Sequence, residues 1–543
     1  MIRYWEKIEN ILSHVKFAII IILVFAIYLI VGTFVESYHG TAYANVLIYK
    51  SLPFLFTQVL MFLSIFYATL KRLPIKKRLR GFYLLHLGLI LLFAGSFLTY
   101  KVGIDGQMIL TPNDANSKIE LPEEYIHVTK QSLLDKDDTA TYSLELPKNS
   151  STTNLNQILE NFHFTQYLPF SDQEIHWSKN EQNKTLTPNV QYYLENDFTS
   201  QDIFLSLNEN TLDFQSSTQL GPLSVHLLPT NIKECLFDSA YLFWNQKEKK
   251  CYTLEKMHPN WKALENTTQS KRPFIILQSV NDHDNPIIYT FFPDTSPYTY
   301  DKDLQVVQNS EWRIFNKKIF EEQRHVLIFE NTISYYNNHD AKWEVYALQP
   351  GDKQDLPWMN FTLKLIKYSN VESLEKRPFF TKPIQENGKI IRGEQKAVFF
   401  TFNGEEYWIS SQRPMNLTWS GVKWTIQLVK RSVALPFKIN LNNFVLKTNP
   451  GENSPASYES YVSLFTSKGS TDHKIYMNHP LKYNGLTFYQ SSYFPLNEEN
   501  TQYGSILSVN WDPARGLKYF GAFLLVFGTM LHFYLKRESK NAS

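Results

Sequence analysis

Four long apolar runs stand out in the hydrophobic pattern of the 543-residue chain. Each run approaches the ~20 residues that a helix needs to cross the hydrocarbon core of a bilayer. The first run is too long for the core of a signal peptide, and no small-residue cleavage pattern follows it. The sequence therefore predicts four transmembrane α-helices, at residues 17–34, 53–70, 82–100 and 517–535.

A long polar segment, residues 101–515, separates the third and fourth apolar runs and has a different pattern. At 361–365 and 437–441 every second residue is apolar, which is the period of a half-buried strand. Turn signals such as Asn484-Gly485 interrupt the strand-like runs. The segment is therefore predicted to form a large mainly-β domain of one or two antiparallel β-sandwiches. One short helix is expected at Asn154 to Asn161.

Positive charge is concentrated in the loop 71–81 after the second apolar run, and again in the tail 536–543. The loop 35–52 between the first two runs has a single lysine. Lysine and arginine accumulate on the cytoplasmic side of membrane proteins. We therefore expect the loop, the tail and the N-terminal segment 1–16 to be cytoplasmic, and the acidic segment 101–515 to be extracytoplasmic.

Few motifs in the outer segment indicate catalysis. The chain has two cysteines, Cys235 and Cys251, which lie on the oxidising side and are candidates for a disulfide. They do not form a C-x-x-C motif, so the sequence does not indicate a thiol oxidoreductase. The H-x-x-x-H and H-E-x-x-H spacings of metal sites and the G-x-S-x-G elbow of hydrolases do not occur in the sequence either. We assign no catalytic residue.

His86 lies inside the third apolar run, about 6 Å from its cytoplasmic end. An ionisable side chain inside a membrane helix is a functional candidate, and neutral imidazole can bind a metal or haem iron without adding charge. A histidine that reaches the interface or bonds a neighbouring helix is the alternative. Gly88 and Gly95 fall on the opposite face of the helix, so packing through the glycines would leave His86 free.

His532, in the fourth apolar run, is the second candidate. It precedes the basic tail by one turn, so we expect it at nearly the depth of His86, where two imidazoles could bind one iron. His532 also shares a helix face with Gly521 and Gly528, which favours a role in helix packing. Both interpretations stay open at this stage.

Sequence motifs near both ends of the chain occur in the order found in one family of membrane proteins. They are Gly32-Thr-Phe-Val-Glu36, Gly40-Thr41 and Leu47-Ile-Tyr49; then His86-Leu-Gly88, Gly95, Thr99, Gly103 and Gly106; then Leu435-Pro-Phe437, Asn449-Pro-Gly451, Met477-Asn-His-Pro480, Tyr483-Asn-Gly485 and Phe488-Tyr-Gln-Ser-Ser-Tyr493. Together with the predicted topology, these motifs resemble the ResB (CcsB) family of system II cytochrome c biogenesis. The resemblance covers about residues 17–110 and 415–537.

The resemblance implies haem handling. A ResB protein works with a membrane protein of the ResC (CcsA) type to carry haem b across the membrane. The haem is then attached through thioether bonds to the C-x-x-C-H sequence of apocytochrome c, whose thiols other proteins of the pathway keep reduced. By this resemblance His86 is an axial ligand of the haem iron, and His532 is a weaker candidate.

The resemblance also implies a bacterial inner or plasma membrane and a non-catalytic or co-catalytic subunit of a haem lyase, the holocytochrome c synthase. The tryptophan-rich haem segment of the ResC partner does not occur in this sequence, so a separate partner is expected. A mildly acidic outer surface suits a basic apocytochrome, although ordinary soluble domains share this property. No nucleic-acid partner is expected. The alternative is a membrane-anchored β-domain scaffold or envelope-assembly module without a cofactor, and haem binding through His86 would separate the two.

Overall fold

The computed structural model divides into two compact units, which we describe separately. Unit 1 consists of residues 1–172 and 378–543, and unit 2 consists of residues 173–377. The structure describes residues 2–541 except 77–78, 134–138, 180–186, 209–212, 237–240, 246, 254–255, 257–260, 267–273, 280–286, 291–297, 301–305, 310–311, 387, 412–413, 450–454 and 498–501.

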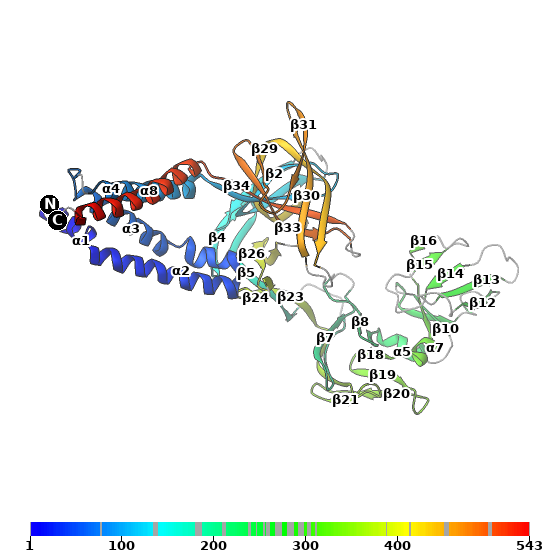
Figure 1. The fold of residues 1–543 in the computed structure, drawn as a ribbon. Helices are drawn as coiled ribbons and strands as arrows, with labels where there is room; N and C mark the ends of the chain where they lie inside the picture. The colour runs from blue at the N-terminus through cyan, green and yellow to red at the C-terminus, as the bar shows by residue number, and fades with distance from the viewer. Residues whose placement is uncertain are drawn as a thin grey trace. The chain divides into compact units, whose positions relative to one another are not determined.

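Unit 1 contains four helices that are long and apolar enough to cross a membrane, which confirms the predicted number among the described residues (Figure 1). The helix α2 continues well past its apolar run, and the π-helix η1 extends it further. The bounds are α2 Val15–Ala44, η1 Asn45–Tyr49, α3 Leu52–Leu70, α4 Arg80–Val102 and α8 Arg515–Asn541, and a short helix α1 Ile2–Leu12 precedes them. The two chain termini lie at the same end of these helices (Figure 1).

The main sheet of unit 1 has the order β31-β30-β29-β2-β1-β34-β33-β32, with β3 added to β2 and β28 added to β29. Its strands pair antiparallel throughout the described residues. The bounds are β1 Ile104–Leu110, β2 Asn116–Ser132, β3 Thr139–Glu145, β28 Met415–Trp419, β29 Val422–Thr448, β30 Pro455–Thr466, β31 Gly469–Ile475, β32 Leu481–Tyr483, β33 Leu486–Pro495 and β34 Tyr503–Trp511.

A second sheet of unit 1 packs on part of the first. Its strands β4, β5, β26 and β27 bury Phe162 and Phe400 against Trp424 and Ile426 of β29. The bounds are β4 Thr153–Leu159, β5 Phe162–Lys179, β26 Gln395–Phe402 and β27 Glu405–Ser410, and a separate hairpin is formed by β24 Ile384–Glu386 and β25 Lys389–Arg392. The expected helix at 154–161 is wrong, because most of this segment is β4, which pairs with β5.

The helices and the main sheet of unit 1 are joined directly. The helix α4 is followed by β1 after one residue, and β34 is followed by α8 after a short turn. The strands β1 and β34 pair antiparallel from Ile104↔Trp511 to Leu110↔Ser505. The two helices that meet in the membrane part therefore continue into two neighbouring strands of the sheet.

Unit 2 is also mainly β. Its described strands form the sheets β11-β10-β17, β12-β13-β14-β15-β16, β20-β19-β18-β9-β8 and β21-β22-β6-β7. The bounds are β6 Asn189–Glu195, β7 Ser200–Ser206, β8 Ser217–Leu220, β9 Leu223–Leu227, α5 Thr230–Leu236, β10 Tyr241–Asn245, β11 Lys250–Thr253, β12 Trp261–Asn266, β13 Phe274–Ser279, β14 Ile287–Thr290, β15 Tyr298–Tyr300, β16 Val306–Asn309, β17 Trp312–Asn316, α7 Lys317–Glu322, β18 His325–Phe329, β19 Thr332–Asn337, β20 Lys342–Ala347, β21 Lys353–Asp355, β22 Thr362–Ser369 and β23 Glu372–Phe380.

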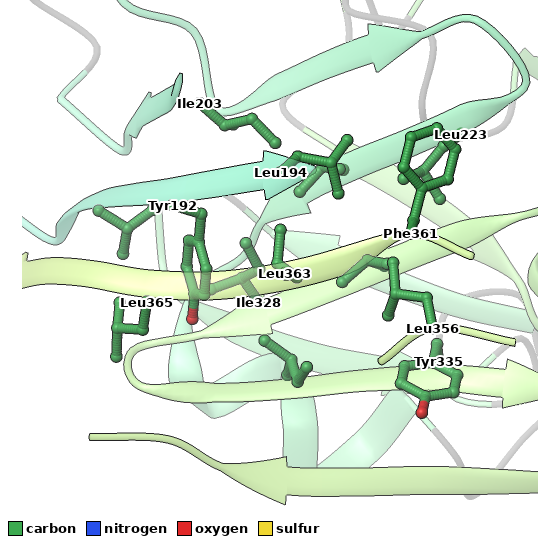
Figure 2. Packing of buried hydrophobic residues seen from close by; sticks show 14 of the residues in the cluster. Tyr192, Leu194, Ile203, Leu223, Ile328, Tyr335, Leu356, Phe361, Leu363 and Leu365 are labelled. Carbon is green, nitrogen blue, oxygen red and sulfur yellow. The ribbon is translucent and has the colours of Figure 1, made fainter. Parts of the chain in front are cut away.

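The largest core of unit 2 lies between two of these sheets (Figure 2). Tyr192 and Leu363, from the four-stranded sheet, are fully buried, as is Ile328 from the five-stranded sheet that contains β18. Phe361, Leu363 and Leu365 are all buried, as their alternation predicts. A mainly-β domain with antiparallel sheets is thus confirmed, although β9 and β18 pair parallel.

Two buried histidines lie beside this core. His226 Nε2 and His325 Nδ1 are 2.9 Å apart, and the pair is continued by Ser217 Oγ, 2.9 Å from His226 Nδ1, and Gln323 Oε1, 3.2 Å from His325 Nε2. Burial, together with the neighbouring His325, lowers the pKa of His226 to about 3. Burial lowers the pKa of His325 to about 4. Both rings are therefore neutral in the folded protein at pH 7.

The buried pair of His226 and His325 predicts that the stability of unit 2 falls at acidic pH. An unfolded histidine has a pKa near 6.5, so the unfolded chain binds more protons than the folded one as the pH falls below about 7. Stability should fall by about 1.4 kcal/mol per pH unit for each histidine until the folded pKa is reached. Thermal unfolding of the full chain between pH 7 and 5, followed by tryptophan emission, measures this.

A double variant, His226→Gln with His325→Gln, should show a much weaker pH dependence. Its matched control is His339→Gln, because His339 is exposed in the same unit and should leave the pH dependence unchanged. An equal pH dependence in the double variant and the natural protein would contradict the assignment.

Candidate functional site

The helices α4 and α8 lie antiparallel and touch backbone to backbone (Figure 1). Gly81, Gly88 and Gly95 are buried at every seventh residue of α4. Gly521 and Gly528 have the same spacing on α8 and lie opposite Gly88 and Leu85. A methyl group added at Gly88 would lie 2.6 Å from the carbonyl oxygen of Gly521. We call this contact the glycine seam; close approach through small residues is typical of helices that pack in lipid.

His86 lies on the face of α4 opposite the glycine seam, as the residue spacing predicts. Its Nδ1 is 2.9 Å from the carbonyl oxygen of Phe82, one turn earlier. A carbonyl oxygen can only accept, so Nδ1 carries the proton and Nε2 keeps its lone pair. The half-buried ring is thus held in the tautomer that binds a metal through Nε2.

Phe82 links His86 to the basic loop. The centroids of the Phe82 and His86 rings are 3.7 Å apart. The guanidinium carbon of Arg72 lies 4.7 Å from the centroid of Phe82, in the range of a cation–π contact. In the sequence, Arg72 is one of several basic residues in the loop after the second apolar run. No periodic pattern indicates that its side chain contacts the third apolar run.

His532 belongs to the glycine seam. Its backbone contacts Gly81, five residues before His86, which corresponds to about 7.5 Å along the helix axis. The backbone of His532 is thus offset from that of His86 by about one and a half turns, although the two side chains are close enough to interact electrostatically. Five residues also turn the helix by about 140°, so His532 meets the face of α4 that His86 does not use. Its Nδ1 is buried without a hydrogen-bond partner in the described part of the chain.

A polar network lies at the end of the glycine seam next to the main sheet. Asp512 accepts a hydrogen bond of 2.7 Å from Thr99 on α4 and forms an ion pair of 2.5 Å with Lys518 on α8. Burial alone would raise the pKa of Asp512, but the hydrogen bonds from Lys518 and Thr99 outweigh it and hold the pKa below its usual value. Of these residues, the resemblance pointed only to Thr99.

The motif after the first apolar run packs the last turns of α2 against η1. Gly32 leaves room for the ring of Tyr49, because a methyl group there would lie 2.6 Å from a ring carbon. The carboxylate of Glu36 accepts hydrogen bonds from Thr41, at 2.8 Å, and from Tyr49, at 3.5 Å. These local contacts therefore explain the spacing of the residues in this motif.

The same end of α2 contacts the hairpin β24–β25. Gly40 interrupts the helix with a φ of 79°, which favours glycine, and a methyl group there would lie 2.6 Å from the side chain of Ile390. His39 Nδ1 is 2.6 Å from the carbonyl oxygen of Pro383. The β-rich part of unit 1 thus contacts α2 and is also continuous with α4 and α8.

The motif 477–493 forms the end of the main sheet. Asn484 and Gly485 both have positive φ, 49° and 77°, as expected for a two-residue hairpin between β32 and β33. The amide oxygen of Gln490 accepts a hydrogen bond of 2.5 Å from Ser460, whose Oγ also lies 2.8 Å from the Oγ of Ser505. These buried polar groups hold β30, β33 and β34 together, which is a structural role.

The two cysteines lie in unit 2, away from the membrane helices in sequence. Cys235 in α5 and Cys251 in β11 are joined by a disulfide, with their Cα atoms 6.6 Å apart. Both pack against a small core that includes Leu236 and Trp244. This bond ties a helix to a strand inside one unit.

Comparison with known proteins gives one family match and one similar protein. Residues 420–500, which include β30, β31 and β32, match the ResB-like family. The chain is also similar to the protein NrfI of Wolinella succinogenes, with 36% identity over 102 residues, which is 18% of this chain. The match spans 11% of the length of NrfI. The two findings confirm the predicted resemblance.

The close contact in the glycine seam predicts that Gly88→Ala destabilises the protein. The added methyl group would meet backbone atoms of Gly521 and Leu525, which cannot move without separating the helices. We expect a loss of about 1–3 kcal/mol in stability, typical of overpacking. Thermal unfolding of the detergent-solubilised chain, followed by circular dichroism, measures it.

Gly516→Ala is the matched control, because a methyl group at Gly516 in α8 meets no atom within 4 Å. That substitution should be neutral or should stabilise the helix by up to about 1 kcal/mol. Equal effects of the two substitutions would show that the glycines do not act through close contact.

Proposed function

We propose that this ResB-like chain is the haem-delivering subunit of a cytochrome c maturation complex. It receives haem b, helps to carry it across a bacterial inner or plasma membrane, and presents it with apocytochrome c for thioether attachment. One observation carries this proposal: His86 stands in an apolar helix, outside the glycine seam, with Nε2 free to bind iron. The confirmed resemblance to the ResB family supports it.

The residues around His86 fit a haem. The hydrogen bond from Nδ1 to Phe82 fixes the orientation of the imidazole, as the outer partners of metal-bound histidines do. The ring is neutral in this tautomer, so it costs less in lipid than a charged ligand. When bound, the haem supplies the iron that Nε2 coordinates and the vinyl groups that later react with thiols.

Haem enters from the cytoplasmic side in this proposal. His86 lies near the end of α4 that follows the basic loop, and both termini lie at that end of the helices (Figure 1). The excess of lysine and arginine at this end supports a cytoplasmic assignment. The opposite ends of α4 and α8 lead into β1 and β34, so the β-rich parts are extracytoplasmic.

We assign the second axial ligand to a membrane partner of the ResC (CcsA) type. His532 is the candidate within this chain, but its backbone is packed against Gly81 in the glycine seam. His86 lies on the other face of α4, where Phe93 and Phe97 further along the helix contact Phe62 of α3. One fixed ligand in this chain suits a haem that two proteins hold in turn.

The covalent step belongs to the assembled complex. Each thioether forms when a thiol of apocytochrome c adds across a haem vinyl group: a carbon–sulfur bond replaces the S–H bond, and the proton goes to the other vinyl carbon. This addition needs reduced thiols, so thiol-reducing partners act on the apocytochrome. The cysteines of this chain are bonded to each other and contribute none. The chain is therefore a non-catalytic or co-catalytic subunit of the haem lyase.

Replacement of His86 tests the proposal. The full chain, purified with its membrane partner, should show a Soret band. His86→Gly should lower the haem content by at least about tenfold, since even loss of an outer partner costs 10–100-fold in metal affinity. Added imidazole should restore the band, because it replaces the lost ligand without restoring any other contact.

His532→Ala is the control and should keep the Soret band. A natural complex without haem, or a band unchanged in His86→Gly, would favour the membrane-anchored scaffold without a cofactor. Loss of the band in His532→Ala, with normal thermal stability, would move the second ligand into this chain.

A further inference from the structure

The side chain of Arg72 is held in a fixed place beside the site of His86. Its Nη1 donates a hydrogen bond of 2.8 Å to the carbonyl oxygen of Ala68, in the last turn of α3. The hydroxyl of Tyr83, on the first turn of α4, donates hydrogen bonds to the carbonyl oxygens of Arg72 and Pro74. The connection between α3 and α4 is thus fixed from both helices.

The guanidinium of Arg72 also contacts the ring of Phe82, whose other neighbour is the imidazole of His86. A guanidinium has five N–H donors, and the described structure uses one of them, toward Ala68. Within the described residues its charge meets no carboxylate. The remaining donors have no hydrogen-bond partner among the described residues, and Arg72 is exposed.

A helix-capping role accounts for only part of this arrangement. Positive side chains near the C-terminus of a helix are favourable, and the bond to Ala68 serves that purpose. Lys71, the neighbouring cation, instead reaches α1 through Asn10, at 2.5 Å. Neither contact explains why the guanidinium lies over the aromatic ring that supports His86.

We propose that Arg72 binds a carboxylate of the ligand that His86 holds, namely a haem propionate. This inference rests on the proposed function and names how the same site recognises its cargo. A haem has an apolar macrocycle around its iron and two propionates on one edge. His86 lies inside the apolar run, while Arg72 lies at its cytoplasmic end, so the two residues match the two chemical parts of the ligand. Arginine suits this task, because its planar fork pairs with a carboxylate through two hydrogen bonds.

The test compares two probes on the full chain in nanodiscs of zwitterionic phosphatidylcholine: haemin and its propionate dimethyl ester. The natural chain should bind the ester about tenfold more weakly, as expected for the loss of a charge-assisted hydrogen bond. Arg72→Gln should bind haemin about tenfold more weakly than the natural chain and should not distinguish it from the ester. Its Soret maximum should stay unchanged, because the iron ligand remains.

Lys76→Gln is the matched control, since it removes the same charge from the same loop. Equal weakening by Lys76→Gln and Arg72→Gln would overturn the proposal in favour of general charge attraction. A natural chain that binds haemin and its ester equally would overturn it too, even if Arg72→Gln failed to fold. A phosphate of the lipid headgroup is the competing anion: if native mass spectrometry shows that Arg72→Gln loses phosphatidylglycerol but keeps its haemin affinity, Arg72 is a lipid site.

These outcomes separate the inference from the proposed function. If His86→Gly loses the Soret band while Arg72→Gln binds both probes normally, His86 is a haem ligand and the propionate assignment alone fails. If the natural chain binds no haemin, both fail.

Discussion

The backbone contact between α4 and α8 determines the arrangement of the candidate site. In lipid, helices gain little from hiding apolar side chains, because the surrounding tails are equally apolar. Association depends on close packing, and the glycines at positions 81, 88 and 95 allow it on one face of α4. The bulkier residues and His86 are thereby left on the other face. The same spacing that joins the helices therefore keeps the histidine available.

This contact also links the apolar helices to the main sheet of unit 1. Because β1 and β34 continue α4 and α8 and pair with each other, the helix pair and the strand pair form one antiparallel unit. At the junction, the ion pair of Asp512 and Lys518 is anchored by Thr99. The low pKa of Asp512 keeps this ion pair charged well below neutral pH. The main sheet is thus fixed to the helix that carries His86.

The sequence predicted the features that depend on regular periods. Four apolar runs became four helices, and the alternation at 361–365 became a buried strand. The opposite faces of His86 and Gly88 followed from helical geometry. The prediction of secondary structure failed where pairing with a distant strand determines the conformation. Leu155 and Leu159 are four residues apart, which suits a helix as well as a strand, and the pairing of β4 with β5 made the choice.

The sequence pattern could not reveal the contacts between different helices, or between a loop and a helix. Depth estimated from helix ends placed His532 at nearly the depth of His86. The register of α8 on α4 is set by which glycines meet, and it puts the backbone of His532 against Gly81 while the two side chains still interact electrostatically. Arg72 looked like one cation among many in a basic loop, because its contact with Phe82 depends on how that loop folds back. The positions of lysine and arginine along the chain predict which ends of the helices are cytoplasmic. The ligand that one of these side chains can bind depends instead on the aromatic and imidazole groups beside it. Packing is therefore needed to find Arg72, whereas the sequence alone is enough to find His86 as the candidate ligand.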